Sequence, residues 1–217
     1  MCNEAARRVS VDQIHDAFRE VRVPLLFPEG LPNLAALDSI RITDPTVIVR
    51  AAHNASAGAE LIQRRWSWPG PGGKPVYNYR GDGRSFHNSP TGGRCLIPLD
   101  GFYEFTDPGT PAEDAHAQPV PGAKRQKKDK WLFTLAPGSI MGSEFFCVAG
   151  VWRADVKVGE AFSMLTCEPG PDIAPYHHRQ IVLMPRAHWA EWLSGTVAAT
   201  ELIHPTPAGA LSVTPAR

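Results

Sequence analysis

The stretch from residue 75 to 105, PVYNYRGDGRSFHNSPTGGRCLIPLDGFYEF, constrains the fold of this chain more than any other part of the sequence. The alternating run 76–80 predicts a half-buried strand, and the Gly-Asp-Gly sequence after it predicts a turn. The apolar run 94–98 predicts a buried strand, and the Asp-Gly pair that follows turns the chain into a further strand over 102–105. The stretch therefore predicts short strands joined by tight turns rather than a helical bundle.

Glu104 is the residue of this stretch whose environment the sequence leaves open. It stands among Phe102, Tyr103 and Phe105. On an alternating strand it would face solvent, which is the default for a carboxylate. Held instead in an apolar site, it would have a raised pKa and could act as a general acid or base.

The rest of the chain adds more strands and a few helices. Ser10 with Gln13 forms a capping-box pattern, which predicts a helix that ends before Pro24. Trp189–Leu193 is predicted to form a short helix, which Gly195 ends. Further predicted elements are strands at 46–49, 131–135, 145–152, 161–167, 181–184 and 211–213, and a short helix within 197–203. The pattern predicts an α+β fold with a strand-rich, mostly antiparallel core.

Length and charge limit the class of protein. The 217 residues suit one domain, and 22 Lys and Arg balance 22 Asp and Glu, so that a nucleic-acid surface would need local clustering of charge. The chain has no apolar run long enough for a membrane span and no apolar signal core near its start, so we expect a cytoplasmic protein. Residues 106–130 have the composition of a flexible insertion and end in a basic run.

Four cysteines are widely spaced: Cys2, Cys95, Cys147 and Cys167. They form no Cys-x-x-Cys pair and have no histidine at ligand spacing, so we expect neither a zinc site nor a disulfide framework. The sequence suggests no metal and no organic cofactor. Apolar neighbours predict that the last three are buried packing residues.

Cys2 is notable for its position. If Met1 is removed, Cys2 carries a free amine and a thiol on adjacent carbons, with reference pKa values of about 8 and 8.5. Such an aminothiol reacts with an aldehyde to form an imine, and the thiol then closes a thiazolidine ring. The alternative is that Cys2 is an ordinary small residue in a frayed terminus.

Further polar residues are candidates for the same chemistry. His177 and His178 follow a proline, and one of them could move protons for a nucleophile elsewhere in the chain, although a surface histidine is usually structural. Asn78 could orient a carbonyl group or simply satisfy the backbone beside a turn.

A second group of residues suggests binding to nucleic acid. Arginines could hold phosphates and tryptophans could stack on bases, although a solvated arginine face is the default interpretation. The candidates are Arg80, Arg84, Arg153, Arg179, Trp66 and Trp68.

Several of these positions match one known pattern in the same order. The chain resembles the SOS response-associated peptidase family, whose domains are called SRAP domains, and the resemblance covers nearly the whole chain. The matching pieces are Met1-Cys2, ITDPTVIVR at 42–50, RRWSWP at 64–69, NYR at 78–80, RCLIPLDGFYE at 94–104, AGVW at 149–152, FSMLT at 162–166 and HHR at 177–179. The RCLIPLDGFYE run is the most specific of them.

The resemblance implies a fold and a site. It implies a single SRAP-like domain over 1–217 with a barrel-like core, in which Cys2 is the nucleophile. It further implies that Asn78 and Glu104 are active-site partners, that His177 is the acid/base histidine, and that Arg80 contacts phosphate.

The resemblance also implies an activity. Proteins of this kind cap abasic sites in single-stranded DNA through a thiazolidine crosslink and remove their own Met1. We therefore expect an enzyme that needs no cofactor, acts as a monomer, has abasic single-stranded DNA as its partner, and is associated with the nucleoid when bound to damaged DNA.

The chain departs from the family pattern at several positions. Asn3 and Glu4 stand where Gly-Arg is usual, Phe105 replaces a tryptophan, and Gln180-Ile181 replaces Met-Pro. Two other functions remain open from the sequence. One is a peptidase that acts on proteins through Cys2 and His177, and the other is a nucleic-acid-binding module without catalysis.

Overall fold

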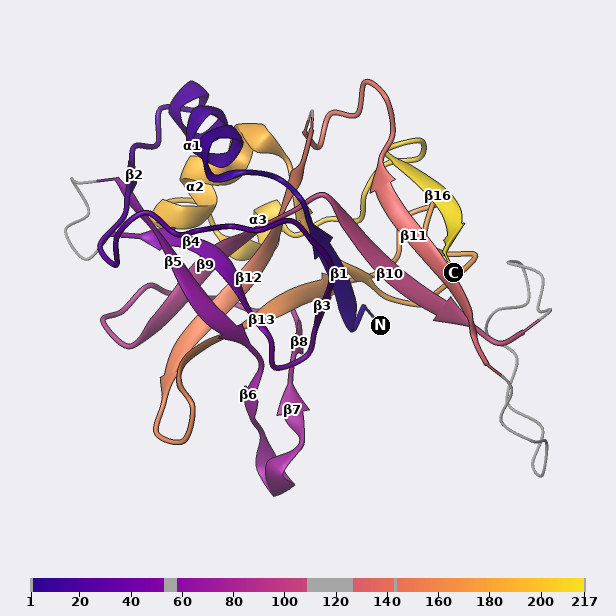
Figure 1. Ribbon diagram of the computed structural model, residues 1–217, viewed down its shortest axis with the longest axis horizontal. Helices are drawn as coiled ribbons and strands as arrows, with labels where there is room; N and C mark the ends of the chain where they lie inside the picture. The colour runs from indigo at the N-terminus through magenta and orange to yellow at the C-terminus, as the bar shows by residue number, and fades with distance from the viewer. Residues whose placement is uncertain (1, 53–57, 109–126, 143, 217) are drawn as a thin grey trace.

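The structure, a computed structural model, describes residues 2–52, 58–108, 127–142 and 144–216 (Figure 1). Its helices are α1 (Val11–Glu20), α2 (Trp189–Ser194) and α3 (Ala199–Leu202). Its strands are β1 (Glu4–Arg7), β2 (Leu25–Leu26), β3 (Leu37–Arg41), β4 (Pro45–Ala51), β5 (Ala59–Trp66), β6 (Trp68–Pro69), β7 (Pro75–Val76), β8 (Asn78–Arg80), β9 (Gly92–Leu99), β10 (Gly101–Thr106), β11 (Asp129–Leu135), β12 (Phe146–Asp155), β13 (Gly159–Cys167), β14 (Gln180–Ile181), β15 (Leu183–Met184) and β16 (Leu211–Ala216).

Five of these strands close into a barrel. β13, β12, β9, β4 and β5 are consecutive antiparallel neighbours. β5 then pairs in parallel with β13, through Arg65 opposite Ala161 and Trp66 opposite Phe162, which completes the ring. Closure leaves these strands with few unpaired edges. The predicted α+β fold with a strand-rich, mostly antiparallel, barrel-like core is confirmed.

Alternation along the barrel strands divides the core in two. Side chains that point outward pack under α1 and α2 and form what we call the outer core, which includes Ile14, Phe18, Val47, Val49, Leu61, Leu96, Ala149, Leu165, Trp189 and Trp192. Their neighbours in sequence point inward and form the inner core, which includes Cys2, Ile48, Ile62, Trp66, Cys95, Ile97, Phe102, Phe133, Val148, Phe162 and Met164. In Figure 1 the helices lie on one side of the barrel strands.

A second sheet, in the order β16-β11-β10-β1-β3, supplies the rest of the inner core. β1 lies between β10 and β3, and all four of its residues are buried. Cys2 comes directly before this strand and is also buried. The start of the chain is therefore an interior element.

The predicted helix ends are confirmed. The Ser10 side chain accepts a hydrogen bond from the Gln13 N–H while the Gln13 side chain accepts one from the Ser10 N–H, so two free donors at the start of α1 are satisfied. Gly195 ends α2 with φ 74, a left-handed conformation that suits glycine. No helix in the described part of the chain is long and apolar enough to span a membrane.

Two predicted strands are interrupted. The run 76–80 divides at Tyr77 because β7 pairs with β6 whereas β8 pairs with β13. The run 181–184 divides at Val182, whose N–H donates to Leu165 while its carbonyl accepts from Ala149, so the chain crosses from β13 to β12.

The sequence interpretation also missed five strands: β1, β2, β3, β5 and β6. The prediction of a flexible insertion over 106–130 falls largely on residues 109–126, which lie outside the described residues. Its two ends belong to strands, since β10 extends to Thr106 and β11 begins at Asp129.

Candidate functional site

Cys2 lies at the centre of a cluster of polar groups in the inner core. Its residue is 1% exposed. The side-chain amide of Asn78 donates a hydrogen bond of 2.7 Å to the Cys2 carbonyl, and the Cys2 thiol lies 3.4 Å from the Glu4 carbonyl. The backbone N–H of Cys2 donates to the Glu104 carboxylate. The structure thus brings together three of the four residues predicted to be catalytic.

Asn78 is positioned by β8. This strand runs parallel to β13, with Asn78 opposite Met164 and Tyr79 opposite Leu165. Asn78 therefore shares the inward face with Met164, and Tyr79 points outward. The Asn78 Oδ1 atom is buried and has no hydrogen-bond partner among the described residues. An unsatisfied acceptor at such a depth is costly, so it offers a place for a donor from a bound molecule.

Glu104 sits in an apolar site and not on a solvent-facing strand surface. It is 1% exposed and lies opposite Trp131 on β11. Burial raises the pKa of its carboxyl to about 7, and the hydrogen bond from the Cys2 N–H opposes this rise. A carboxyl group with such a pKa exists in both protonation states near neutral pH and can donate or accept a proton.

The four thiols are all deeply placed. Burial, followed by the nearby charge of Glu104, raises the pKa of the Cys2 thiol far above its usual range. Burial likewise raises the pKa of Cys95 and Cys147, and it raises that of Cys167 to about 12. Each thiol is thus protonated at neutral pH, and Cys2 differs from the others by its polar neighbours.

His177 lies on the segment between β13 and β14, which borders the same core. Ile173 and Tyr176 of this segment pack into the inner core. His177 Nδ1 lies 3.0 Å from both the backbone nitrogen and the carbonyl oxygen of Arg179, so the Arg179 backbone holds this side of the ring. The His177 ring is half-buried and stacks at 4.4 Å on that of His178, which is exposed.

Two of the six residues predicted to bind DNA, Trp66 and Arg179, are structural in this fold. Trp66 is 0% exposed, and its ring N–H donates to the Tyr77 carbonyl. The buried Arg179 donates to the Thr166 carbonyl at 2.9 Å and forms an ion pair with Asp82. Neither side chain is available to a strand of DNA on the surface.

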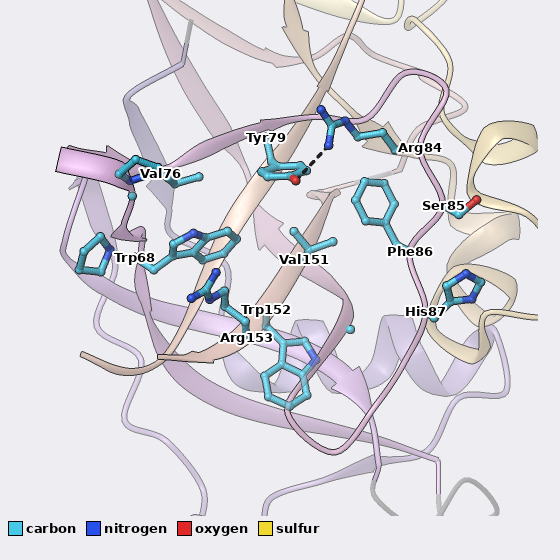
Figure 2. Close-up of a pocket in the computed structure, with 14 residues that line it drawn as sticks. Trp68, Val76, Tyr79, Arg84, Ser85, Phe86, His87, Val151, Trp152 and Arg153 are labelled. Atoms are coloured by element: carbon cyan, nitrogen blue, oxygen red, sulfur yellow. Dashed lines mark hydrogen bonds between the residues drawn. The ribbon is translucent and has the colours of Figure 1, made fainter. Parts of the chain in front are cut away.

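Of the other four predicted DNA-binding residues, Arg80, Arg84 and Arg153 are exposed, whereas Trp68 is buried. The Arg80 side chain is 67% exposed and is 3.7 Å from Asp82. Trp68, Arg84 and Arg153 surround one pocket of about 770 Å³ on the outer side of the barrel (Figure 2).

Tyr77 and Trp131 belong to the site but were missed from the sequence. Burial raises the pKa of Tyr77, and the charges of Cys2 and Glu104 add to this effect, which places its hydroxyl near both groups. Trp131 lies opposite Glu104, and its ring centroid is 5.1 Å from that of Tyr176. The only sequence signal for Tyr77 was its position next to Asn78, and Trp131 carried none.

Glu4, which departs from the family pattern noted in the sequence, forms an ion pair with a lysine of β11. Lys130 Nζ lies 2.8 Å from its carboxylate and 3.8 Å from the centre of the Tyr103 ring. Burial alone would raise the pKa of Glu4, but Lys130 and the Ser39 hydroxyl together lower it. A cation therefore lies near the start of β1 even though the sequence there is acidic.

The chemistry of this site follows from its nitrogen and its acid. A backbone nitrogen lies beside a carboxyl group that can transfer protons at neutral pH, and the adjacent carbonyl is held by Asn78. The described residues contain no group of three metal-ligating side chains.

Comparison with known proteins identifies a family and solved structures of the same fold. The model of the family described as "SOS response associated peptidase (SRAP)" matches residues 1–217. Among solved structures, the crystal structure of a phage-related protein from Bordetella bronchiseptica superposes with a TM-score of 0.68. It is 16% identical and covers 100% of this chain and 94% of that one, so it shows a shared fold. No curated protein sequence matches.

Proposed function

This chain belongs to the SOS response associated peptidase family, and from that premise we propose that it captures abasic sites in single-stranded DNA. Removal of Met1 exposes the amine of Cys2, and this aminothiol forms a thiazolidine with the ring-opened sugar of the abasic site. The aldehyde is already electrophilic, so the proposed reaction requires no cofactor.

One observation carries the proposal. The backbone nitrogen of Cys2 donates a hydrogen bond to Glu104, whose pKa burial raises to about 7. After hydrolysis of the Met1–Cys2 peptide bond, which consumes one water, the same nitrogen is the reacting amine. A proton donor and acceptor is thus already next to the atom at which two proton transfers must occur.

The proposed steps balance without oxidation or reduction. The amine attacks C1′ of the aldehyde, and a proton moves from nitrogen to oxygen to give a carbinolamine. Glu104 then protonates the departing hydroxyl group, water leaves, and the resulting iminium returns its N–H proton to Glu104, which leaves an imine. Finally the Cys2 sulfur bonds to C1′, and the thiol proton passes to the nitrogen to close the ring.

The surrounding residues explain the order of these steps. Because burial and Glu104 keep the Cys2 thiol protonated, the amine attacks first and the thiol follows as a neutral group. Asn78 holds the Cys2 carbonyl, and its unpaired Oδ1 can accept a hydrogen bond from the sugar. His177 assists proton transfer through Nε2, and the exposed Arg80 contacts a phosphate.

A peptidase that acts on other proteins is the second candidate, in keeping with the family name. The burial of Cys2 argues against it, because a residue that is 1% exposed is better suited to one small reacting group, such as a sugar without its base, than to an extended protein segment. Cleavage of the chain's own first peptide bond requires no such segment.

The test is a crosslinking assay with single-stranded DNA that carries one abasic site. We expect a protein–DNA band that survives denaturation, in which the protein lacks the mass of Met1. The matched control is the same DNA after borohydride reduction, which converts the aldehyde to an alcohol and should give no band. Absence of a crosslink with the unreduced DNA, or an active protein that retains Met1, would contradict the proposal.

A further inference from the structure

The pocket on the outer side of the barrel lies on the face opposite to Cys2. It has a volume of about 770 Å³, and β6, β8, β12 and the loop before β9 contribute to it. Figure 2 shows Trp68 and Arg153 on one side of the pocket, Phe86 and His87 on the other, and Val151 between them. We call it the aromatic pocket; its ring-bearing side chains are Trp68, Tyr79, Phe86, His87 and Trp152.

The same two chain segments supply the aromatic pocket and the Cys2 site. On β8, Asn78 points inward to Cys2 while Tyr79, its neighbour, packs on the outer core. At the end of β5, Ser67 has φ 89, and this turn directs Trp66 into the inner core and Trp68 into the pocket. The two sites therefore lie back to back across one layer of sheet.

Trp68 and Trp152 are buried, but Tyr79 and Phe86 leave part of their apolar surface exposed in the aromatic pocket. Trp68 and Tyr79 are tilted by 47° with centroids 6.5 Å apart, and Tyr79 meets Phe86 edge-on at 6.2 Å. Neither pair is stacked face to face. Tyr79, Phe86 and Val151 are only half-buried, so the pocket presents flat apolar surfaces of the kind that accept a planar ligand.

The charge of the pocket has one sign. Its lining includes Arg84 and Arg153 but no aspartate or glutamate. The Arg84 guanidinium lies 5.0 Å from the Tyr79 ring centre and donates to the Tyr79 hydroxyl at 3.1 Å. That of Arg153 lies 5.4 Å from the Trp68 ring centre and also pairs with Asp155 at 3.2 Å.

Both guanidinium groups are therefore pre-positioned over aromatic rings. The side chain of Arg153 is 51% exposed, and Arg84 is exposed as well. Each keeps N–H donors that face water, and planar guanidinium groups of this kind bind phosphate oxygens well.

We infer that the aromatic pocket binds an unpaired, intact nucleobase of single-stranded DNA, with Arg84 and Arg153 on the phosphates beside it. Flat aromatic surface with flanking cations matches a base and its phosphates, whereas an apolar peptide segment would bring no anion to either arginine. The inference rests on the proposed function, because the base belongs to the strand whose abasic site reaches Cys2. The exposed Arg80 at the end of β8 lies where the DNA would pass from the aromatic pocket to Cys2.

The test measures binding of undamaged single-stranded DNA by fluorescence anisotropy. Phe86→Leu removes a ring and keeps an apolar side chain; we expect about tenfold weaker binding, as is typical for the loss of one base-stacking contact. The double variant Arg84→Gln/Arg153→Gln, which changes only exposed side chains, should also weaken binding and reduce its salt dependence. Arg19→Gln, an exposed arginine of α1, is the matched control and should bind as the wild type does.

A second oligonucleotide decides between a base and a phosphate contact. In it, tetrahydrofuran residues, which lack both base and aldehyde, replace the nucleotides. Wild type should bind this DNA more weakly, and Phe86→Leu should reduce its affinity no further. Equal losses for both oligonucleotides, or wild-type binding by Phe86→Leu, would overturn the inference.

A competition measurement completes the test. A free deoxynucleotide monophosphate is added as a competitor of the bound DNA. If it competes at a lower concentration than an unlabelled strand of 12 nucleotides does, the pocket is a site for free nucleotides and the inference is wrong. Because these DNAs carry no aldehyde, the outcome is independent of whether the wild type forms a crosslink with abasic DNA.

Discussion

The Cys2 site and the aromatic pocket use the same strand, β8, in opposite ways. On the inward side, Cys2 and Glu104 are each 1% exposed, and the polar groups hold one another at fixed positions. On the outward side, Arg84 and Arg153 are exposed and the rings of Tyr79 and Phe86 are half-buried. Proton transfer benefits from a buried acid with a raised pKa, whereas binding of a charged polymer requires open surface.

This contrast separates the expected effects of substitution. Changes on the inward side should alter the rate of the chemical step while affinity for DNA is retained. Changes on the outward side should alter affinity and its dependence on salt. Each prediction below tests that separation.

The largest effect is expected for Cys2→Ala, which should abolish the denaturation-resistant crosslink because both the sulfur and the ring closure are lost. Cys147→Ala should retain it, since that thiol lies in the outer core beneath the helices. The measurement is the crosslinked fraction on a denaturing gel, with circular dichroism to confirm folding. Crosslinking by folded Cys2→Ala at the wild-type level would place the chemistry elsewhere.

Glu104→Gln should slow crosslinking by about a hundred- to ten-thousand-fold, the usual contribution of a general acid or base. Its affinity for undamaged single-stranded DNA should stay within about twofold of the wild type. The wild-type rate should also fall as pH rises above about 7, where the carboxyl loses its proton, and Glu104→Gln should lack this decline. A rate independent of Glu104 with normal folding would remove it from the chemistry.

His177→Ala should slow the same reaction by about a hundredfold, because the Arg179 backbone engages Nδ1 and proton transfer then uses Nε2. His178→Ala is the matched control, since this neighbouring ring is exposed, and its effect should be much smaller. Single-turnover rates at saturating abasic DNA provide the comparison. A larger effect of His178→Ala would reverse the assignment of the two histidines.

The burial of Glu104 should also be visible in stability. Between pH 4.5 and about 7 the unfolded chain loses this proton while the folded chain keeps it. The free energy of unfolding should therefore fall as pH rises through this interval, by roughly 3 kcal/mol for this group. Urea titrations should show a flatter profile for Glu104→Gln and greater stability than the wild type above pH 7.

The smallest effect is expected for Arg80→Ala, at the edge between the two faces. Loss of one exposed phosphate contact should weaken binding a fewfold and lower the log–log salt slope by about one. Arg19→Ala again serves as the control. An unchanged slope would place Arg80 outside the DNA interface.

Much of the fold was predictable because long apolar runs are unambiguous when both faces of a strand are buried. β9, β12 and β13 form the barrel wall between the outer and inner cores. Both faces of these strands are therefore apolar, and each strand appears in the sequence as a continuous apolar run. The start of α1 was predictable from Ser10 and Gln13 alone, because the capping box is a local interaction.

Two of the missed strands, β1 and β3, lacked any such local signal. β1 is a four-residue strand, EAAR, in which even Glu4 and Arg7 are buried, so neither apolar character nor alternation marks it. β3 is mostly exposed, with Ile40 as its one buried residue. Both form strands because β1 pairs with the edge of β10, and β3 pairs in turn with β1.

The site was predictable in its residues but not in its geometry. Whether Glu104 faces water depends on how β1 and Cys2 pack beside it. This contact joins distant parts of the chain and cannot be inferred from sequence spacing. Trp68, Arg84 and Arg153 were each candidates for DNA contact, but their convergence on one pocket depends on the turn at Ser67 and on the β8–β13 pairing.

The position of β1 also determines when during folding the reactive group can form. Asn78 and Cys2 are 76 residues apart in sequence, and the ion pair between Arg64 and Glu160 near the closure of the barrel joins residues 96 apart. Contacts between such distant residues form late, because each requires a long loop to close. A nascent or misfolded chain therefore has no Glu104 beside its first peptide bond. Under the proposed self-cleavage, Met1 would be removed only from molecules that have completed the barrel.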